Sequence, residues 1–296
     1  MTAERNFWEL LAARMEEEKH VCVGLDSDEE RIPDCLREVH RYPANLVTSF
    51  NSAIVDATGD LVLALKMDLA FYEALGDVGI RALQDTIRYT RNARPGVPVI
   101  GDANRTSIAN ANRGYASFLF DYLGLDAITV HPYLGAEALG PFLERKEKGI
   151  FVLCRTSNPG AGEFQDLLVP ADWSPEGRVP LYQQVAHRVA KHWNRMGNCG
   201  VVVGATYSQE LHAVRQLVGD AMLILIPGIG AQGGDLEATV NAGKNSKGHG
   251  MIINVSRAII FASSGKDFAQ AARAAVVDFQ GQIRAKLEDA RVNRFG

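Results

Sequence analysis

Eight short, continuously apolar segments recur along the chain, and longer amphipathic segments separate them. They begin at Val21, Leu61, Val97, Ala127, Ile150, Gly200, Met222 and Gly250. Because their apolar residues are continuous rather than alternating, these segments are typical of strands that are buried on both faces of a parallel sheet. Eight strand–helix units within about 250 residues predict a single (β/α)8 barrel, or TIM barrel.

An open, doubly wound parallel sheet is the alternative α/β fold. In that fold a glycine-rich dinucleotide-binding loop usually follows the first strand, whereas here the segment "GLDSDEERIP" occupies that place. The barrel is therefore favoured. No linker divides the chain, so we expect residues 1–296 to form one barrel domain, with an additional helix in residues 1–20 that closes its bottom.

The longest connection between two predicted elements lies between Arg155 and Leu181 and is rich in Gly, Pro, Asp and Ser. A long loop in a compact domain is usually functional. In a barrel it would follow the fifth strand, on the carboxyl-terminal face where active sites lie. We therefore predict that residues 155–180 form a lid loop over a binding site.

Charge and composition exclude several classes of protein. The formal net charge is −4 at pH 7 and no basic stripe is visible, which argues against a nucleic-acid partner. No apolar run approaches the roughly 20 residues that a membrane-spanning helix needs. The charged, amphipathic first residues differ from a signal peptide, and the four cysteines show no CxxC or metal-ligand spacing. We expect a cytoplasmic enzyme or binding protein that has no membrane partner.

Polar residues stand where the predicted strands end, which is where barrel enzymes place their chemistry. In chain order they are Asp26, Lys66, Asp102 with Asn104, His131, Arg155 to Asn158, Thr206, the segment Pro227 to Asp235, and Ser256 with Arg257. A buried ammonium must be paired, and Asp26 and Asp102 are plausible partners of Lys66. Alternatively, Lys66 extends its ammonium into solvent. His131 is either an acid or base or a hydrogen-bonded structural histidine.

The segment "PGIGAQGGD", which begins at Pro227, predicts a binding site for an anion. Its glycines allow close approach of the backbone, and N–H groups beside a helix N-terminus bind phosphate. Arg257 follows the eighth strand and is suited to bidentate phosphate binding. Because the loops after strands seven and eight form the usual phosphate site of barrels, we predict a phosphorylated ligand. The alternative is a glycine-rich turn with a surface arginine.

Several motifs together resemble the orotidine 5′-phosphate decarboxylase family, in its longer bacterial branch. They are "CVGLDSD", "FNSAIVDAT", "LKMDLAFYEALG", "GDANR", "ITVHPYLG", "FVLCRTSNPGAGEFQDL", "VVVGAT", "IPGIGAQGGD" and "INVSRAII". The resemblance implies a homodimeric (β/α)8 barrel with active sites at the dimer interface. It implies a carboxy-lyase that converts orotidine 5′-monophosphate to UMP and CO2, the last step of de novo pyrimidine biosynthesis, without metal or organic cofactor.

The resemblance also implies roles for individual residues. Asp26 and Lys66 are expected to bind the ribose hydroxyls, and Ser157 the pyrimidine. Gln232, its adjacent backbone and Arg257 are expected to hold the 5′-phosphate of the nucleoside 5′-monophosphate. The remaining residues of the expected substrate-binding set are Thr129, Pro227, Gly233 and Ser256.

The chain departs from the family at the motif Asp-x-Lys-x-x-Asp, which follows the third strand. Asp102 occupies the first position, but Asn104 replaces the lysine that protonates C6, and Ser107 replaces the aspartate that reaches the partner's site. An amide is no useful acid at neutral pH, and the guanidinium of Arg105 does not readily release a proton. Losing a charged donor costs about 10²- to 10³-fold in rate, and losing the proton source about 10²- to 10⁴-fold.

Three functions remain open on this sequence. The chain is a decarboxylase with a variant residue set, a diverged hydrolase, lyase or isomerase acting on a nucleoside 5′-monophosphate, or a non-catalytic nucleotide-binding protein. The candidate catalytic residues are Lys66, Asp102, Asn104, Ser107 and His131. Retention of a buried lysine–aspartate pair favours an enzyme over a simple binder, because such pairs are costly to desolvate.

Overall fold

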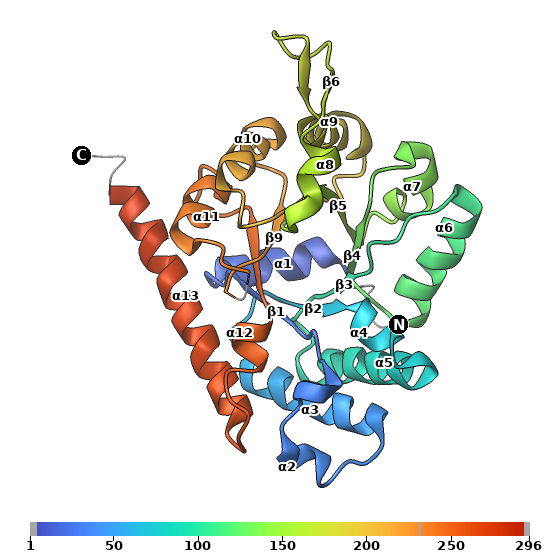
Figure 1. The fold of residues 1–296 in the computed structure, drawn as a ribbon, viewed down its shortest axis with the longest axis vertical. Coiled ribbons are helices and arrows are strands. Elements are labelled where there is room, and N and C mark those ends of the chain that lie inside the picture. Colours follow the sequence, from blue (N-terminus) through green and yellow to red (C-terminus); the bar gives the residue numbers. More distant parts are fainter. Residues whose placement is uncertain (1–4, 231, 293–296) are drawn as a thin grey trace. The chain divides into compact units, whose positions relative to one another are not determined.

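The computed structural model describes residues 5–230 and 232–292 (Figure 1). Its contacts divide the chain into two compact units. The first unit comprises the described residues through Ala103, together with Ala116–Ile128 and Asn254–Arg284. The second comprises Asn104–Tyr115, Thr129–Ile253 and the described residues from Ala285 onward.

Eight parallel strands form a closed barrel in the order β1-β10-β9-β8-β5-β4-β3-β2. The strands are β1 (Val21–Gly24), β2 (Ala64–Asp68), β3 (Val99–Asp102), β4 (Ala127–Val130), β5 (Gly149–Arg155), β8 (Cys199–Val203), β9 (Ile224–Pro227) and β10 (Met251–Val255). Each lies at one of the eight predicted apolar segments, and nearly all of their residues are buried. The barrel prediction is therefore confirmed, and the open doubly wound sheet is excluded.

Helices follow the strands along the chain. They are α1 (Phe7–Glu16), α2 (Asp34–Arg37), α3 (Pro43–Thr58), α4 (Leu69–Glu73), α5 (Gly76–Ala93), α6 (Ala109–Ala116), α7 (Gly135–Leu143), α8 (Gly162–Gln165), α9 (Leu181–Arg188), α10 (Ser208–Val218), α11 (Leu236–Gly243), α12 (Arg257–Ile260) and α13 (Phe268–Val292). Short 3-10 turns, η1 (Glu29–Arg31) and η3 (Pro159–Ala161), and π-helical turns, η2 (Ser117–Tyr122) and η4 (Val189–Trp193), complete the set.

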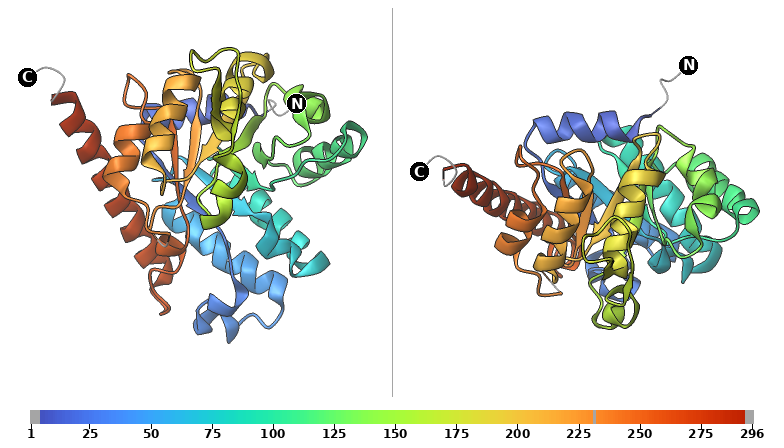
Figure 2. Two further views of the ribbon diagram at one scale, coloured as in Figure 1. Left: turned by 45° about the horizontal axis from the view of Figure 1, so that its top comes forward. Right: turned by 90° about the horizontal axis from the view of Figure 1, so that it is seen from above.

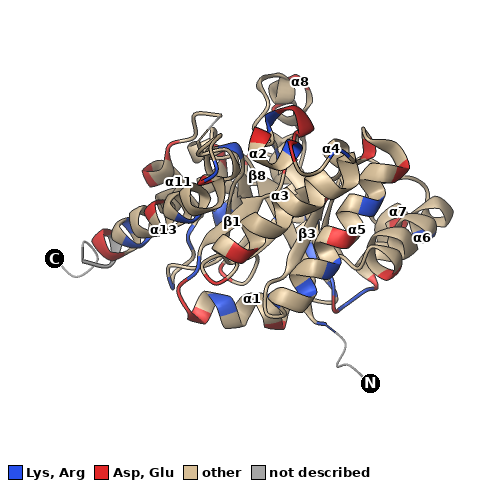
Figure 3. Cartoon of the chain, turned by 90° about the horizontal axis from the view of Figure 1, so that it is seen from below, with Lys and Arg blue, Asp and Glu red and all other residues tan. Residues whose placement is uncertain are grey.

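Amphipathic spacing explains why these segments form helices that pack on their neighbours. In α5 the residues Ala82, Leu83, Thr86, Ile87 and Thr90 are buried, at the spacing of three and four that forms one helix face. Within the second unit α10 and α11 lie side by side (Figures 1 and 2). On α5 and α13 acidic and basic residues are interspersed, so neither helix presents a run of one charge (Figure 3). None of the helices in the described part of the chain is long and apolar enough to cross a membrane.

The additional N-terminal helix is α1, and it lies against the amino-terminal end of β2. Asn6 caps it, because its side chain accepts hydrogen bonds from the N–H groups of Trp8 and Glu9. The buried guanidinium of Arg14 donates to the carbonyl oxygens of Gly59 (2.6 Å) and Val62 (2.5 Å), which precede β2. These bonds satisfy a buried cation with backbone acceptors and fix the position of the helix.

The segment over residues 155–180 contains regular structure, which the prediction of a loop missed. After η3 and α8, the chain forms an antiparallel hairpin of β6 (Leu168–Pro170) and β7 (Arg178–Pro180). The hairpin projects beyond α9 within the second unit (Figure 1). Strands of three residues have no readable alternation, so only their pairing reveals them.

Candidate active site

A charged cluster occupies the carboxyl ends of β1, β2 and β3 in the first unit. Lys66 is only 3% exposed, and its Nζ lies 2.7 Å from Asp102 Oδ2 and 3.7 Å from Asp26 Oδ1. The structure therefore pairs this ammonium with both predicted carboxylates, and the alternative of a solvent-directed lysine is wrong. The prediction that Lys66 ends its strand is also corrected, because β2 continues to Asp68.

Strand register brings a further carboxylate, Asp68, into this cluster. Asp68 pairs with Asp102 across β2 and β3, and Gly24 pairs with Lys66 across β1 and β2. Since side chains alternate along a strand, Lys66, Asp68 and Asp102 share one face of the sheet. Sequence reasoning missed Asp68, although its position two residues after Lys66 was the signal that could have identified it.

The ionisation of this cluster is set by burial and by the excess of carboxylates. Burial alone lowers the pKa of Lys66, but Asp102, Asp26 and Asp68 together outweigh it and hold the pKa above its usual value. The ammonium therefore stays charged. Burial raises the pKa of Asp68, Lys66 opposes this shift, and the negative charges of Asp102 and Asp26 add to it. Burial and the neighbouring carboxylates therefore make the charged form of Asp68 less favourable than that of an exposed aspartate.

Ser256 and Arg257 follow β10 in the same unit. A Cβ built on Gly24 would lie 1.9 Å from Ser256 Oγ, so only glycine at position 24 allows Ser256 to pack against β1. Arg257 begins α12 and is exposed. An exposed guanidinium can bind an anionic ligand without first breaking a buried ion pair.

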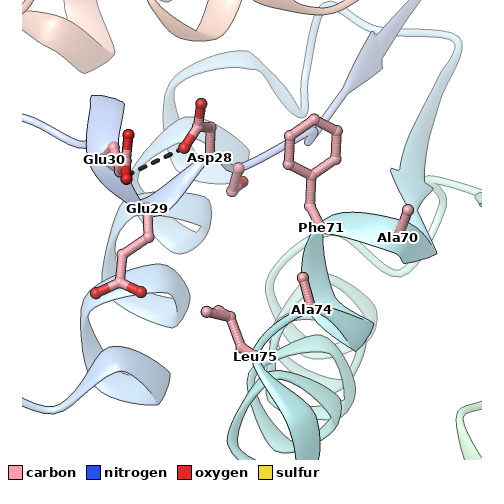
Figure 4. A pocket seen from close by; sticks show the side chains of 8 residues that line it. Asp28, Glu29, Glu30, Ala70, Phe71, Ala74 and Leu75 are labelled. Atoms are coloured by element: carbon pink, nitrogen blue, oxygen red, sulfur yellow. Dashed lines mark hydrogen bonds between the residues drawn. The ribbon is translucent and has the colours of Figure 1, made fainter.

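An open pocket of about 430 Å³ lies between residues 27–30 and residues 70–75 (Figure 4). It is lined by Ser27, Asp28, Glu29, Glu30, Ala70, Phe71, Ala74 and Leu75. The backbone N–H of Glu30 donates to Asp28 Oδ1 (3.1 Å), which caps η1. Residues of α4 and of the turn after it supply the apolar part of the lining, while Ser27 and three acidic residues supply the rest. These acidic residues disfavour a phosphate group in this pocket.

In the second unit Asn104 is held by Thr129. The Asn104 N–H donates to Thr129 Oγ1 (3.0 Å), and that hydroxyl donates to Asn104 Oδ1 (2.9 Å). Asn104 has a φ of +48°, in the left-handed region that asparagine tolerates better than most residues. Position 104 therefore carries a neutral amide whose oxygen accepts a hydrogen bond from Thr129 of β4.

The segment that follows Asn104 is anchored to the end of β4 and to α6. Thr106 Oγ1 donates to the carbonyl oxygen of His131 (2.7 Å). The buried side chain of Asn112 accepts from the Ser107 N–H (2.8 Å) and donates to the Ser107 carbonyl oxygen (2.8 Å). Ser107 is thus held in place through its backbone. Its half-buried hydroxyl takes no part in these two hydrogen bonds.

The start of the predicted lid is fixed by Arg155. Arg155 is 2% exposed. Its guanidinium carbon lies 3.7 Å from the ring centroid of Tyr207, and its Nε lies 3.0 Å from Asp166 Oδ1. The Thr156 N–H donates to Gln165 Oε1 (2.8 Å). These contacts connect α8 and the residue after it to the end of β5, and so hold the first half of the predicted lid against the barrel strand.

Ser157 and Gln232 meet in the second unit, where Ser157 Oγ donates to Gln232 Oε1 (3.0 Å). Both belong to the predicted substrate-binding set. After Pro227, Gly228 has a φ of +107°, which only glycine adopts readily, and the loop turns there toward Gln232 and Gly233. The structure therefore brings together the predicted pyrimidine and phosphate ligands of this unit.

Burial sets the reactivity of two of the cysteines. Within residues 5–230 and 232–292, no group of three His, Cys, Asp or Glu side chains is arranged to hold a metal ion. Burial raises the pKa of the Cys22 and Cys154 thiols to about 12. Neither thiol is therefore a thiolate nucleophile at neutral pH.

Comparison with known proteins places this geometry in context. Residues 19–275 match the model of the orotidine 5′-phosphate decarboxylase / HUMPS family. The chain is 46% identical to an orotidine 5′-phosphate decarboxylase of Cellvibrio japonicus over 263 residues, 89% of this chain and 92% of that protein. It is 45% identical to the enzyme of the same name from Roseiflexus castenholzii over 283 residues, 95% and 98% of the two chains.

Solved structures show the same similarity. A putative orotidine-monophosphate decarboxylase of Toxoplasma gondii superposes with a TM-score of 0.83 at 32% identity, covering 97% of this chain and 99% of that one. The orotidine-monophosphate (OMP) decarboxylase of Leishmania donovani superposes with a TM-score of 0.79 at 34% identity, covering 95% and 98%. The similarity therefore spans almost the whole of each chain.

Proposed function

The chain belongs to the orotidine 5′-phosphate decarboxylase / HUMPS family, and from this premise we propose that it binds a pyrimidine nucleoside 5′-monophosphate and decarboxylates orotidine 5′-monophosphate to UMP. The observation that carries the proposal is the buried Lys66, held between Asp102 and Asp26 at the strand ends. An ammonium preorganised in a buried site stabilises negative charge that develops in a transition state, here at C6 of the pyrimidine. Lys66 therefore takes the electrostatic role in the reaction.

The residues implied by the resemblance complete this assignment. Asp26 and Lys66 bind the ribose hydroxyls, and Ser157 binds the pyrimidine. Gln232, Gly233 and Arg257 hold the 5′-phosphate. The hydrogen bond between Ser157 and Gln232 supports placing the base and phosphate ligands of the second unit in one site. The free cysteines Cys22, Cys35, Cys154 and Cys199 are in keeping with a reducing, cytoplasmic compartment.

A second candidate function is supported by Asn104. Its neutral amide is engaged by Thr129, so position 104 supplies neither a charge nor a proton. A nucleotide-binding site that lacks the motif lysine at position 104 suits a non-catalytic binding protein, or an enzyme that carries out another reaction on a nucleoside 5′-monophosphate. In the latter case Lys66, Asp102 and His131 form the acid–base set.

Binding and turnover distinguish these functions. Calorimetry with UMP is expected to show saturable binding, and an ultraviolet assay is expected to show conversion of orotidine 5′-monophosphate to UMP. Binding without turnover would support the second candidate. Absence of UMP binding at millimolar concentration, with folded protein, would contradict both.

Replacing Arg257 by alanine is expected to weaken UMP binding about 10- to 100-fold, the effect of losing a hydrogen bond between charged groups. Uridine, which lacks the phosphate, is expected to bind the variant and the parent chain equally. Calorimetry with both ligands measures the difference. Arg81→Ala, an exposed arginine on α5, serves as the control. Equal losses for UMP and uridine would remove Arg257 from the phosphate site.

We further propose a symmetric homodimer in which Ser107 lies near the partner's site. Three apolar side chains are exposed close to one another in the chain segments after β3 and β4: Ile108 (64%), Tyr133 (89%) and Leu134 (41%). The bond from Thr106 to the His131 carbonyl oxygen joins these segments. Exposed apolar clusters of this kind are typical of protein interfaces.

Sedimentation tests the dimer. The parent chain is expected to sediment as a dimer, and Tyr133→Glu is expected to shift the equilibrium toward monomer, because a charge would be buried at the interface. Tyr42→Glu, at a tyrosine that is 67% exposed in the first unit, is the matched control and is expected to leave the dimer intact. A monomeric parent chain would contradict the proposal.

A further inference from the structure

Three of the sequence motifs meet beside Asp26 in the first unit. The segment "CVGLDSD" carries Leu25 and Ser27 on either side of Asp26. The segment "FNSAIVDAT" carries Asn51 on α3, and "LKMDLAFYEALG" carries Tyr72 on α4. Leu25, Ser27, Asn51 and Tyr72 are each at most 2% exposed. Since buried polar groups need hydrogen-bond partners, the partners of Asn51 and Tyr72 indicate what these two motifs do.

Hydrogen bonds link these residues into one path, which we name the Asn51 network. Ser27 Oγ donates to Asn51 Oδ1 (2.5 Å), and Asn51 Nδ2 donates to the Tyr72 hydroxyl (3.0 Å). That hydroxyl in turn donates to the Leu25 carbonyl oxygen (2.9 Å). Burial raises the pKa of Tyr72, so the hydroxyl keeps the proton that it donates. The Asn51 network therefore ties together the two residues that flank Asp26.

Asp26 itself lies where the backbone has no regular structure. Strand β1 ends at Gly24, and residues 25–28 form neither helix nor strand. Asp26 Oδ1 is buried and accepts no hydrogen bond from any described residue, although it lies 3.7 Å from Lys66 Nζ. That distance is too long for a hydrogen bond. The direction of this carboxylate therefore depends on the backbone on either side of it, which the Asn51 network holds.

Asn51 is an unfavourable residue for packing alone at its position in α3. Val47, Ile54 and Val55, which are four residues before it and three and four residues after it, are all buried. Asparagine is a weak helix former, and burying an amide costs free energy unless it is hydrogen-bonded. The second amide hydrogen of Asn51 goes to Thr86 Oγ1 (3.1 Å) on α5. An apolar residue would serve the contact between α3 and α5, so what the amide adds is its hold on the end of β1.

We propose that Asn51 is a positioning residue, whose network holds the backbone around Asp26 so that the carboxylate faces the ribose hydroxyls of the nucleotide. This inference rests on the nucleotide binding proposed above, which assigns those hydroxyls to Asp26. A carboxylate that is already in place loses less conformational freedom when the ligand binds, so the ligand binds more tightly. The effect concerns the ribose and leaves the contacts of the phosphate unchanged.

Calorimetry with two nucleotides tests this role. Ser27→Ala removes the hydroxyl that bonds to Asn51 and is expected to weaken UMP binding about 10-fold, the lower end of what a hydrogen bond to a charged group contributes. 2′,3′-Dideoxyuridine 5′-monophosphate lacks both ribose hydroxyls and is expected to bind the variant and the parent chain equally. Tyr72→Phe, which breaks the network at the Leu25 carbonyl oxygen, is expected to give the same pattern.

Two controls separate positioning from support of the fold. Thr58→Val removes another buried hydroxyl of α3, which donates to the carbonyl oxygen of Ile54 in its own helix (2.7 Å). It is expected to lower stability in denaturant unfolding and to leave UMP affinity unchanged. In an Asp26→Ala background, Ser27→Ala is expected to have no further effect on UMP binding, because the positioned carboxylate is gone.

The outcomes distinguish this inference from the proposed function. If UMP binds the parent chain and binds folded Ser27→Ala and Tyr72→Phe equally well, the inference is overturned and the proposed function stands. Equal losses for UMP and the dideoxy nucleotide, or an undiminished loss in the Asp26→Ala background, would also overturn it. If the parent chain does not bind UMP, both fail together. A loss that requires both the ribose hydroxyls and Asp26 supports the inference.

Discussion

The double variant Asn104→Lys/Ser107→Asp is expected to decarboxylate orotidine 5′-monophosphate about 10²- to 10⁴-fold faster than the parent chain. The lysine restores an ammonium that stabilises the developing carbanion and supplies its proton. The aspartate restores the carboxylate that the family extends into the partner's site. The ultraviolet assay of turnover measures the ratio directly, with UMP affinity recorded beside it.

Two structural features set the conditions for this experiment. The φ of +48° at position 104 makes a lysine there about 1 kcal/mol less favourable than in ordinary backbone. Lysine also gives up the bond that the Asn104 amide accepts from Thr129. A modest loss of stability in the double variant is therefore expected, and its unfolding should be measured alongside its rate.

A matched control makes the same two substitutions at exposed positions. Asn110→Lys/Ser117→Asp changes the charge of the chain equally, at residues outside the proposed site, and is expected to leave turnover unchanged. If the parent chain matches the rate of the double variant, a residue already present supplies the proton. If the double variant binds UMP and still fails to turn over substrate, the remaining substrate-binding residues no longer align the substrate for decarboxylation.

Replacing Lys66 by methionine is expected to lower the free energy of unfolding by about 3–5 kcal/mol at pH 7. Methionine nearly fills the volume of the lysine stem, so the main effect is electrostatic. Asp102 and Asp26 lose their buried partner, and with Asp68 they are left as three close carboxylates. Denaturant unfolding of the parent chain and the variant measures the difference.

The pH dependence of this loss follows from the same charges. The pKa of Lys66 is raised in the folded protein, so its stabilising effect is fully present below the unfolded lysine pKa of about 10.4 and is lost only at higher pH. Near neutral pH the stabilising effect of Lys66 is therefore constant. In the Lys66→Met variant, acidification protonates the carboxylates that face position 66, so the deficit is expected to shrink as pH falls toward 4.

Lys286 provides the comparison for Lys66. Its Nζ lies 2.6 Å from Glu237 Oε2, but the two side chains are 35% and 58% exposed, so Lys286→Met is expected to change stability little. Adding Asp102→Asn to Lys66→Met is expected to recover part of the loss, because it removes one of the close negative charges. A loss below about 1 kcal/mol for Lys66→Met would show that water screens the cluster despite its burial.

The barrel was predictable from the sequence because its signals are local. Each buried parallel strand is a continuous apolar run, and eight such runs alternating with amphipathic helices match one architecture. Lys66 and Asp102 were identified for the same reason, since a charged side chain at the end of an apolar run has few explanations. The pairing of Lys66 with Asp26 and Asp102 follows from the general requirement that a buried ammonium be neutralised.

Non-local features could not be predicted in this way. The β6–β7 hairpin consists of strands of three residues, and only pairing across the intervening turn defines them. The pocket that begins at Ser27 is formed by η1 and α4, whose approach no local pattern encodes. Asn104 could be recognised as a replaced lysine, whereas its left-handed backbone and its bonds to Thr129 depend on the end of β4.

By itself, therefore, the sequence determined which polar residues follow each strand of the barrel and that Asn104 stands where the family motif has a lysine. These properties depend on residue identity and on spacing along the chain. Tertiary structure alone decided that Asp68 lies beside Asp102, because register between β2 and β3 is set by hydrogen bonds between strands that are distant in sequence. Through that register, Asp68 joins the carboxylates that hold the pKa of Lys66 above its usual value.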